Sequence, residues 1–261
     1  MRSNPMKAAL ARGEMQVGTW INMVRNPAIL TLMKAAGLDF ARVDMEHAPT
    51  SLETVADMAL VSRALEFPII VRPPSADREW VSRLLDAGVW GLHVPGIESV
   101  EQAAALADAA LFAPAGSRGM APIGPQTDYE DRDASTQEFM NRQTHLTVMF
   151  ESERTFEHLE AIAALPGIDA LGVGPTDLAQ SLGVFGKPEQ AEVVGRYQAR
   201  LLEVATAHGK DVSVLVRTVE EGARHIARGA RIICYASESD LLRHALTDAA
   251  ARLHAAARPP A

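Results

Sequence analysis

Residues 38–49 read LDFARVDMEHAP, an apolar run that ends in three ionisable side chains within four residues, Asp44, Glu46 and His47. Short apolar runs rich in β-branched residues recur along the chain, and an Ala/Leu-rich stretch with helical spacing follows each of them. This alternation is typical of βα units around a parallel sheet. The stretch therefore predicts a buried strand whose charged end is either a solvated turn or the edge of an active site.

The same pattern occurs eight times. The predicted strands cover residues 16–23, 40–43, 68–71, 91–94, 146–150, 170–173, 211–216 and 231–235. Eight units favour an α/β fold, a closed (β/α)8 TIM barrel that forms a single domain over residues 1–261. A doubly wound open sheet is the alternative, because a sequence does not reveal whether a sheet closes, although no glycine-rich dinucleotide fingerprint follows any predicted strand.

Two segments depart from this rhythm. Residues 112–145, between the fourth and fifth predicted strands, are rich in Pro, Gly, Asp and Gln. We predict an excursion there, with a short helix over residues 134–142, that builds either an oligomer contact or a wall of the active site. Residues 1–15 are predicted to form a leading helix beneath the barrel.

Charge and composition restrict the class of partner. Lys and Arg total 25 against 33 Asp and Glu, and the net charge of -8 argues against nucleic acid or an anionic membrane as the main partner. A small molecule is favoured instead. The single cysteine, Cys234, cannot form an internal disulfide, and the chain shows neither a secretory signal nor an apolar run of about 18 residues. These features predict a cytoplasmic protein.

Acidic residues follow two neighbouring strands. In a (β/α)8 barrel the catalytic residues lie at the C-terminal ends of the strands, and Glu151 and Asp177 follow the fifth and sixth. Two carboxylates in this arrangement suit a hard divalent cation that keeps several waters, such as Mg2+ or Mn2+. The ordinary alternative is that such acids cap the helices that follow, and Asp177 stands just before a helical pattern.

Arg72 and His47 are candidate catalytic side chains at the same rim. Arg72 emerges from an apolar strand just before Pro73-Pro74. It forms a structural ion pair with Asp44, or it clamps a substrate carboxylate or a developing enolate oxygen, and both roles can hold together. His47, which follows the two acids Asp44 and Glu46 at the rim that Arg72 shares, is a candidate general acid/base near neutral pH.

Missing residue types narrow the chemistry. None of the four lysines follows the C-terminal end of a predicted strand, which disfavours a Schiff-base aldolase. The segments after the seventh and eighth strands lack the glycines of a barrel phosphate site, which disfavours a phosphorylated substrate. No Gly-x-Ser-x-Gly elbow or Cys-His pairing suggests a nucleophilic hydrolase.

An ordered set of short motifs covers nearly the whole chain. The motifs are Gly18-Thr19-Trp20, Asp44-Met45-Glu46-His47, Arg72-Pro73-Pro74, Leu84-Leu85-Asp86-x-Gly88, Val94-Pro95, Pro114-x-Gly116-x-Arg118-Gly119, Glu151 and Gly174-Pro175-Thr176-Asp177-Leu178. In this order and spacing the chain resembles the HpcH/HpaI aldolases, metal-dependent class II enzymes that act on pyruvate-type 2-oxo acids. The resemblance implies a carbon–carbon lyase.

The resemblance also implies roles for the rim residues. Glu151 and Asp177 are similar to the protein ligands of a Mg2+, Mn2+ or Co2+ ion, whose coordination the carboxylate and 2-oxo oxygens of the substrate complete. Arg72 is similar to the arginine that stabilises the enolate, with Asp44 orienting it. His47 resembles the acid/base residue.

Further implied roles concern the pocket walls and the subunits. Asp86 is similar to the dyad partner of His47, which in this family comes from an adjacent subunit. The main chain around Thr176, within the turn that Gly174 and Pro175 begin, is expected to meet the substrate carboxylate. Trp20 and Leu215 are expected to line the pocket. Relatives are hexamers, trimers of dimers that swap a C-terminal helix, and residues 241–257 are Ala/Leu-rich.

The expected reaction is reversible cleavage of a 4-hydroxy-2-oxo acid to pyruvate, or to a related 2-oxo acid such as hydroxypyruvate, and an aldehyde. Two departures bear on the substrate. Met149 stands where the family often has glutamine, and Thr176 replaces the more usual alanine. Citrate-synthase-like condensation or oxaloacetate decarboxylation on the same scaffold is therefore the alternative, and a catalytically idle barrel that acts in binding or assembly is a third reading.

Overall fold

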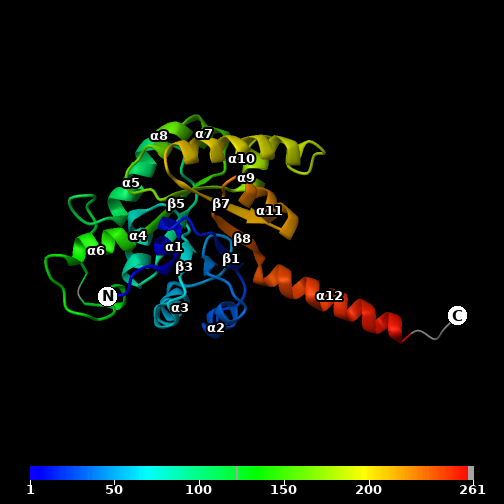
Figure 1. The fold of residues 1–261 in the computed structure, drawn as a ribbon, viewed down its shortest axis with the longest axis horizontal. Helices are drawn as coiled ribbons and strands as arrows, with labels where there is room; N and C mark the ends of the chain where they lie inside the picture. Colours follow the sequence, from blue (N-terminus) through cyan, green and yellow to red (C-terminus); the bar gives the residue numbers. More distant parts are fainter. Residues whose placement is uncertain (122, 258–261) are drawn as a thin grey trace.

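The computed structural model describes residues 1–121 and 123–257 and contains a closed barrel of eight parallel strands (Figure 1). The strands pair in sequence order and β1 pairs with β8, so the sheet has no free edge. Their bounds are β1 Gln16–Ile21, β2 Phe40–Asp44, β3 Ile69–Arg72, β4 Gly91–Val94, β5 His145–Phe150, β6 Ala170–Val173, β7 Asp211–Val216 and β8 Ile232–Ser237. The predicted (β/α)8 barrel is confirmed, and the open doubly wound alternative is wrong.

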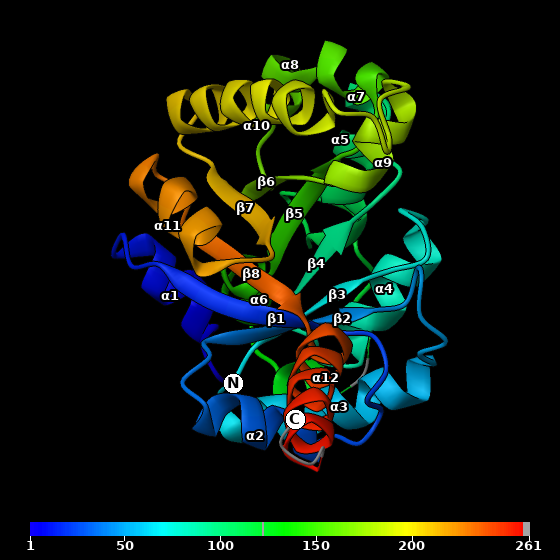
Figure 2. The same ribbon diagram turned by 90° about the vertical axis from the view of Figure 1, so that its right-hand side faces the viewer.

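Helices alternate with the strands and cover the outside of the barrel (Figure 2). They are α1 Pro5–Ala11, α2 Ala28–Ala35, α3 Leu52–Leu65, α4 Arg78–Asp86, α5 Val100–Ala110, the 3-10 helix η1 Pro125–Thr127, α6 Thr136–Gln143, α7 Glu153–Glu157, α8 Leu159–Ala163, α9 Pro175–Ser181, α10 Gln190–Ala207, α11 Val219–Ala227 and α12 Glu238–Ala256. None of these described helices is long and apolar enough to cross a membrane.

Two predicted boundaries are wrong for identifiable reasons. The first strand ends at Ile21 rather than at residue 23, because the main-chain N–H groups of Asn22, Met23 and Val24 donate to the buried carboxylate of Glu238 instead of to a neighbouring strand. The leading helix is shorter than residues 1–15. It begins after Asn4, whose side chain accepts from two main-chain N–H groups of the first turn.

The leading helix closes the N-terminal end of the barrel, as predicted. Met6 and Leu10 of α1 pack in one buried cluster with side chains from inside the barrel, namely Phe40, Ile70, Trp90, Ala170 and Ile232. A larger cluster packs the outward faces of the strands against the helices. These side chains fill much of the lower part of the barrel, alongside the buried polar pair of His145 and Thr147 on β5.

α12 extends away from the barrel in Figure 1 and points toward the viewer in Figure 2. Every residue of α12 is described, and Glu238 is the one that is buried. Large apolar side chains remain exposed on the rest of the helix, with Leu246 at 67% and Leu253 at 72% of their accessible area. A helix of 19 residues with this pattern lacks a partner within its own chain.

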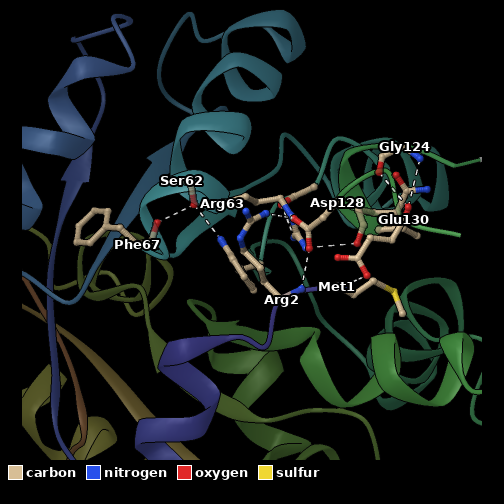
Figure 3. Close-up of polar contacts among 12 residues, drawn as sticks. Met1, Arg2, Ser62, Arg63, Phe67, Gly124, Asp128 and Glu130 are labelled. Atoms are coloured by element: carbon tan, nitrogen blue, oxygen red, sulfur yellow. Dashed lines mark hydrogen bonds and ion pairs between the residues drawn. The ribbon is translucent and has the colours of Figure 1, made fainter.

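The excursion over residues 112–145 is anchored to the N-terminal side of the barrel through Asp128 (Figure 3). Arg63 at the end of α3 donates to both carboxylate oxygens of Asp128, over 2.7 and 3.0 Å, and Arg2 donates to them from its main chain and its guanidinium. Burial alone would raise the pKa of Asp128, but these donors hold it at about 2. The Asp128 carboxylate thus fastens the excursion to the N-terminus and to α3.

We predict that Asp128→Asn lowers the free energy of unfolding by about 2 kcal/mol at pH 7, because the native carboxylate has a depressed pKa. A depressed pKa stabilises the fold above the unfolded-state value near 4. The difference between wild type and variant should therefore shrink as the pH falls from about 4 toward 2. Urea unfolding at pH 7 and at acidic pH measures it. Asp131→Asn, at an exposed position nearby, is the control, and equal losses for both variants would contradict the prediction.

Candidate active site

A cavity of about 320 Å³ opens at the C-terminal ends of the strands. Nine of the eleven predicted site residues line it: Trp20, Asp44, His47, Arg72, Gly174, Pro175, Thr176, Asp177 and Leu215. Barrel closure brings these segments together, although they are spread over some two hundred positions of the chain. Among the described residues of the excursion none lines this cavity, so the excursion does not form a wall of its own chain's site.

Two carboxylates hold the guanidinium of Arg72. Its Nε donates to Asp44 Oδ1 over 2.9 Å, and its Nη2 donates to Asp44 Oδ2 over 2.8 Å. Nη1 lies 3.1 Å from Glu46 Oε2 in a further ion pair. Burial raises the pKa of Asp44, but the hydrogen bonds and charge of Arg72 outweigh that effect and keep it below its usual value. The predicted pairing of Arg72 with Asp44 is confirmed, and its two-pronged geometry fixes the guanidinium plane.

Asp44 also shapes the loop that carries His47. Its Oδ1 accepts from the main-chain N–H of Glu46 over 3.0 Å and of His47 over 3.4 Å. The His47 side chain is 60% exposed, and its Nε2 lies 3.6 Å from Glu46 Oε2. Burial raises the pKa of Glu46, against the opposing charges of Arg72 and His47. Glu46 therefore lies between the arginine and the histidine and contacts both.

Asp86 lies away from the cavity. It is the last residue of α4, which runs back from the rim, and its Oδ1 accepts from Arg118 Nη2 over 2.6 Å. Because a helix that follows a barrel strand ends at the opposite face of the barrel, Asp86 cannot meet His47 of the same chain. The implied dyad requires a second subunit.

Glu151 stands directly after β5, behind the wall formed by Gly174. Its Oε1 accepts from the main-chain N–H of Gly96 over 2.6 Å. A Cβ atom at position 174 would lie 2.9 Å from the Cβ of Glu151 and 3.0 Å from its Oε2, so glycine there leaves room for the carboxylate. Burial raises the pKa of Glu151, and the negative charges of Glu46 and Asp177 raise it further, against the hydrogen bond from Gly96.

Asp177 is the third residue of α9 rather than its cap. The N-cap is Gly174, Pro175 is the first helical residue, and no side chain caps the helix. The capping role weighed for Asp177 is therefore wrong, and its carboxylate is free to face the cavity.

The carboxylates of Glu151 and Asp177 fit a hard divalent cation. No group of three or more His, Cys, Asp or Glu side chains that could hold a metal occurs among the described residues, so an ion held here would have these two carboxylates as its protein ligands. A cation with that few protein ligands takes its other oxygens from water and substrate, as Mg2+ commonly does. Burial and then the negative charges of Glu46 and Asp177 raise the pKa of Glu151, and a bound cation would offset both effects.

Sequence reasoning missed three polar residues that line the lower part of the cavity: Arg42, His93 and Ser213. All three are buried, and Arg42 Nη2 donates to Ser213 Oγ over 2.9 Å. The signal was present in the alternation of β2, where Phe40 faces the barrel interior and Asp44 faces the cavity. Arg42, between them at the same spacing of two, has to face inward as well.

Comparison with known proteins agrees with this geometry. The sequence profile of the HpcH/HpaI aldolase/citrate lyase family matches residues 16–245. The chain belongs to this family. The match spans all eight strands and the first part of α12, and the resemblance carried by the short motifs is confirmed. Family membership makes the chain a carbon–carbon lyase.

Relatives and solved structures of this family resemble the chain over almost its full length. A 5-keto-4-deoxy-D-glucarate aldolase of Enterobacter sp. (strain 638) is 30% identical over 248 residues, which is 93% of each protein. An HpcH/HpaI aldolase from Desulfitobacterium hafniense DCB-2 superposes with a TM-score of 0.92 at 27% identity, covering 97% of both chains. The citrate synthase SbnG superposes with a TM-score of 0.85 at 25% identity, covering 97% of this chain and 99% of SbnG.

We predict that Asp44→Asn lowers the free energy of unfolding by about 3 kcal/mol at pH 7, because it removes one member of a buried ion pair and leaves the charge of Arg72 under-compensated. Chemical denaturation measures the change. Asp57→Asn, at an exposed position on α3, is the matched control and should change stability by no more than about 0.5 kcal/mol. A loss no larger than the control's would show that Glu46 alone is a sufficient partner for Arg72.

Proposed function

We propose that the protein is a divalent-metal-dependent aldolase that reversibly cleaves 4-hydroxy-2-oxo acids to pyruvate, or a related 2-oxo acid such as hydroxypyruvate, and an aldehyde. The observation that carries the proposal is the arrangement of one cavity. Asp177 and Arg72 line it, with the guanidinium plane of Arg72 fixed by Asp44, and Glu151 lies at the neighbouring strand end against Gly174. The aldolase activity named for the relative from Enterobacter agrees with it.

Glu151 and Asp177 would hold the Mg2+, Mn2+ or Co2+ ion. When bound, such an ion polarises the 2-oxo group and favours loss of the aldehyde fragment as C3 takes up the electron pair. Arg72 donates to the oxygen on which negative charge grows, and its fixed position means that little reorganisation is needed as the charge develops. Main-chain N–H groups around Thr176 meet the substrate carboxylate, while Trp20 and Leu215 exclude water from the sides of the cavity.

His47 serves as the base that takes the proton from the 4-hydroxyl group. Its exposed ring stands at the mouth of the cavity, with Nε2 3.6 Å from Glu46 Oε2. We propose that Asp86 of a neighbouring subunit also contacts the imidazole ring of His47.

A second candidate function is condensation or decarboxylation with oxaloacetate. Two observations favour it: the likeness to the citrate synthase SbnG, and the apolar thioether of Met149 in the cavity lining. Product analysis separates the two functions. Release of pyruvate and an aldehyde from a 4-hydroxy-2-oxo acid supports the aldolase, whereas turnover of oxaloacetate only, with or without an acyl-CoA, supports the second candidate.

We predict that Glu151→Gln abolishes pyruvate release, lowering kcat/KM at least about 100-fold, and weakens divalent cation binding in calorimetry. The amide keeps the shape of the side chain but removes the negative charge that binds the cation. Glu153→Gln, at an exposed position two residues along the chain, is the matched control. Unchanged metal affinity in Glu151→Gln, or activity that survives exhaustive chelation of wild type, would contradict the proposal.

We also propose a homo-oligomer, a hexamer built as a trimer of dimers, in which α12 packs on a neighbouring subunit. The exposed apolar side chains of α12 and the distance of Asp86 from His47 within one chain both call for a second copy. Leu246→Asp combined with Leu253→Asp should therefore yield smaller particles in light scattering, because burial of these side chains drives the contact. Ala251→Asp, which adds charge on another face of the exposed helix, controls for charge, and an unchanged mass in the double variant would refute the role of α12.

A further inference from the structure

Arg42 places a positive charge inside the barrel. It lies on β2 one inward position below Asp44, and it is 2% exposed. Its Nη2 donates to Ser213 Oγ over 2.9 Å, and its Nε has no hydrogen-bond partner in the protein. The guanidinium lies over the indole ring of Trp20, at 5.1 Å from the ring centre, and lines the floor of the cavity.

No carboxylate among the residues that the structure describes forms an ion pair with Arg42. The two nearest acids along the chain, Asp44 at the end of β2 and Glu46 just after it, already pair with Arg72. The thiol of Cys234 does not supply a counter-charge, because burial raises its pKa to about 11. An arginine stays protonated at neutral pH, and a buried charge without a partner is strongly destabilising. The middle of a barrel is usually filled by branched apolar side chains, which makes this placement costly without a ligand.

Two further buried nitrogen atoms of cavity-lining residues lack a partner. They are Trp20 Nε1, which can only donate, and His93 Nδ1. His93 lies on β4, with its ring 5.8 Å from the indole of Trp20 in an edge-on contact. Burial, and then the charges of Arg42 and Arg72, lower the pKa of His93 well below its usual value, so its neutral ring offers one N–H. Buried polar groups of a folded protein are nearly always paired, so three unpaired nitrogen atoms on side chains that line one cavity point to a polar ligand, which these side chains would turn to meet.

We propose that Arg42, with Trp20 and His93 beside it, binds a second carboxylate of the substrate, so that this enzyme acts on dicarboxylic compounds. The inference rests on the proposed function, in which the carboxylate next to the 2-oxo group is bound by the metal site and by the main chain around Thr176. A planar carboxylate matches the free Nε edge of a guanidinium and accepts from more than one donor at once. Arg42 and Arg72 lie over the same indole ring, at 5.1 and 4.6 Å from its centre, so one short molecule can reach both.

The second carboxylate has two possible sources, the 2-oxo acid fragment or the aldehyde fragment. Matched compounds distinguish them. In the condensation direction with pyruvate, glyoxylate carries a carboxylate where glycolaldehyde has a neutral group of similar size. As inhibitors of aldehyde release from a 4-hydroxy-2-oxo acid, oxaloacetate carries a carboxylate where 4-methyl-2-oxopentanoate has an apolar group of similar size.

The test compares wild type with Arg42→Met, which removes the charge and keeps the length of the side chain. For the aldehyde pair the preference is the ratio of the two kcat/KM values, and for the inhibitor pair it is the ratio of the two inhibition constants. In Arg42→Met, the preference for the anionic compound should fall about 10- to 100-fold in one of the two pairs. Arg217→Met, at an exposed arginine of the same cavity, is the matched control. Unchanged preference in Arg42→Met for both pairs, or a larger change in Arg217→Met, would overturn the inference.

A binding measurement separates the inference from the proposed function. Metal-free protein with succinate as the probe should melt roughly 2–4 °C higher than without it, and Arg42→Met should lose this shift. Without succinate, Arg42→Met should melt no lower than wild type, since replacing an unpaired buried charge by a thioether does not destabilise a core. A succinate shift that depends on Arg42 supports the inference even if no lyase activity is found. If the enzyme has lyase activity, but Arg42→Met changes neither its preference for anionic compounds nor the melting temperature with succinate, the inference is wrong and the proposed function is unaffected.

Discussion

Side chains alternate between the two faces of a β-strand, and in a closed barrel this alternation sends every second residue into a space that no helix covers. The architecture of the site depends on this constraint. Along β2, Phe40 contributes to the apolar floor, Arg42 to the middle of the barrel and Asp44 to the rim. One strand of five residues thus contributes to the apolar cluster beneath the cavity, to its floor and to the acid that orients Arg72. A shift of one residue in its register would replace all three by residues that pack against the helices.

The two inward-facing arginines differ in how their charge is compensated. Arg72 has Asp44 on two of its nitrogen atoms and Glu46 on the third, so its direction is set before any substrate arrives. Such a group stabilises a transition state because it does not have to move when charge appears. Arg42 has a hydroxyl group on one nitrogen atom and an aromatic face, and neither neutralises it. Arg72 is therefore suited to stabilising the charge that develops during the reaction. Arg42 is suited to selecting anionic ligands, since an unpaired buried charge discriminates strongly against neutral ones.

Most of the fold, and the upper part of the site, follow from local pattern. Eight apolar runs, each followed by a helical stretch, leave few other topologies, and strand ends in a barrel must converge, so Asp44, Arg72 and Asp177 could be placed together before any coordinates existed. Boundaries were harder, because the end of β1 depends on a carboxylate more than two hundred positions away in Glu238. Arg42 was overlooked because a run of apolar neighbours hides a single charge, although counting by twos from Asp44 would have located it.

Long-range pairing also limits what a single sequence reveals about Asp86. Read along the helix, it is a polar residue at a helix end, and in the folded chain it binds the buried guanidinium of Arg118 from the excursion. That contact fixes Asp86 at the face of the barrel opposite to the cavity. A contribution of Asp86 to the reaction would then have to come across a subunit boundary, in the oligomer that we propose. In such an assembly the excursion has a catalytic consequence although it lines no cavity of its own chain, because it holds in place the acid that a neighbouring His47 would use.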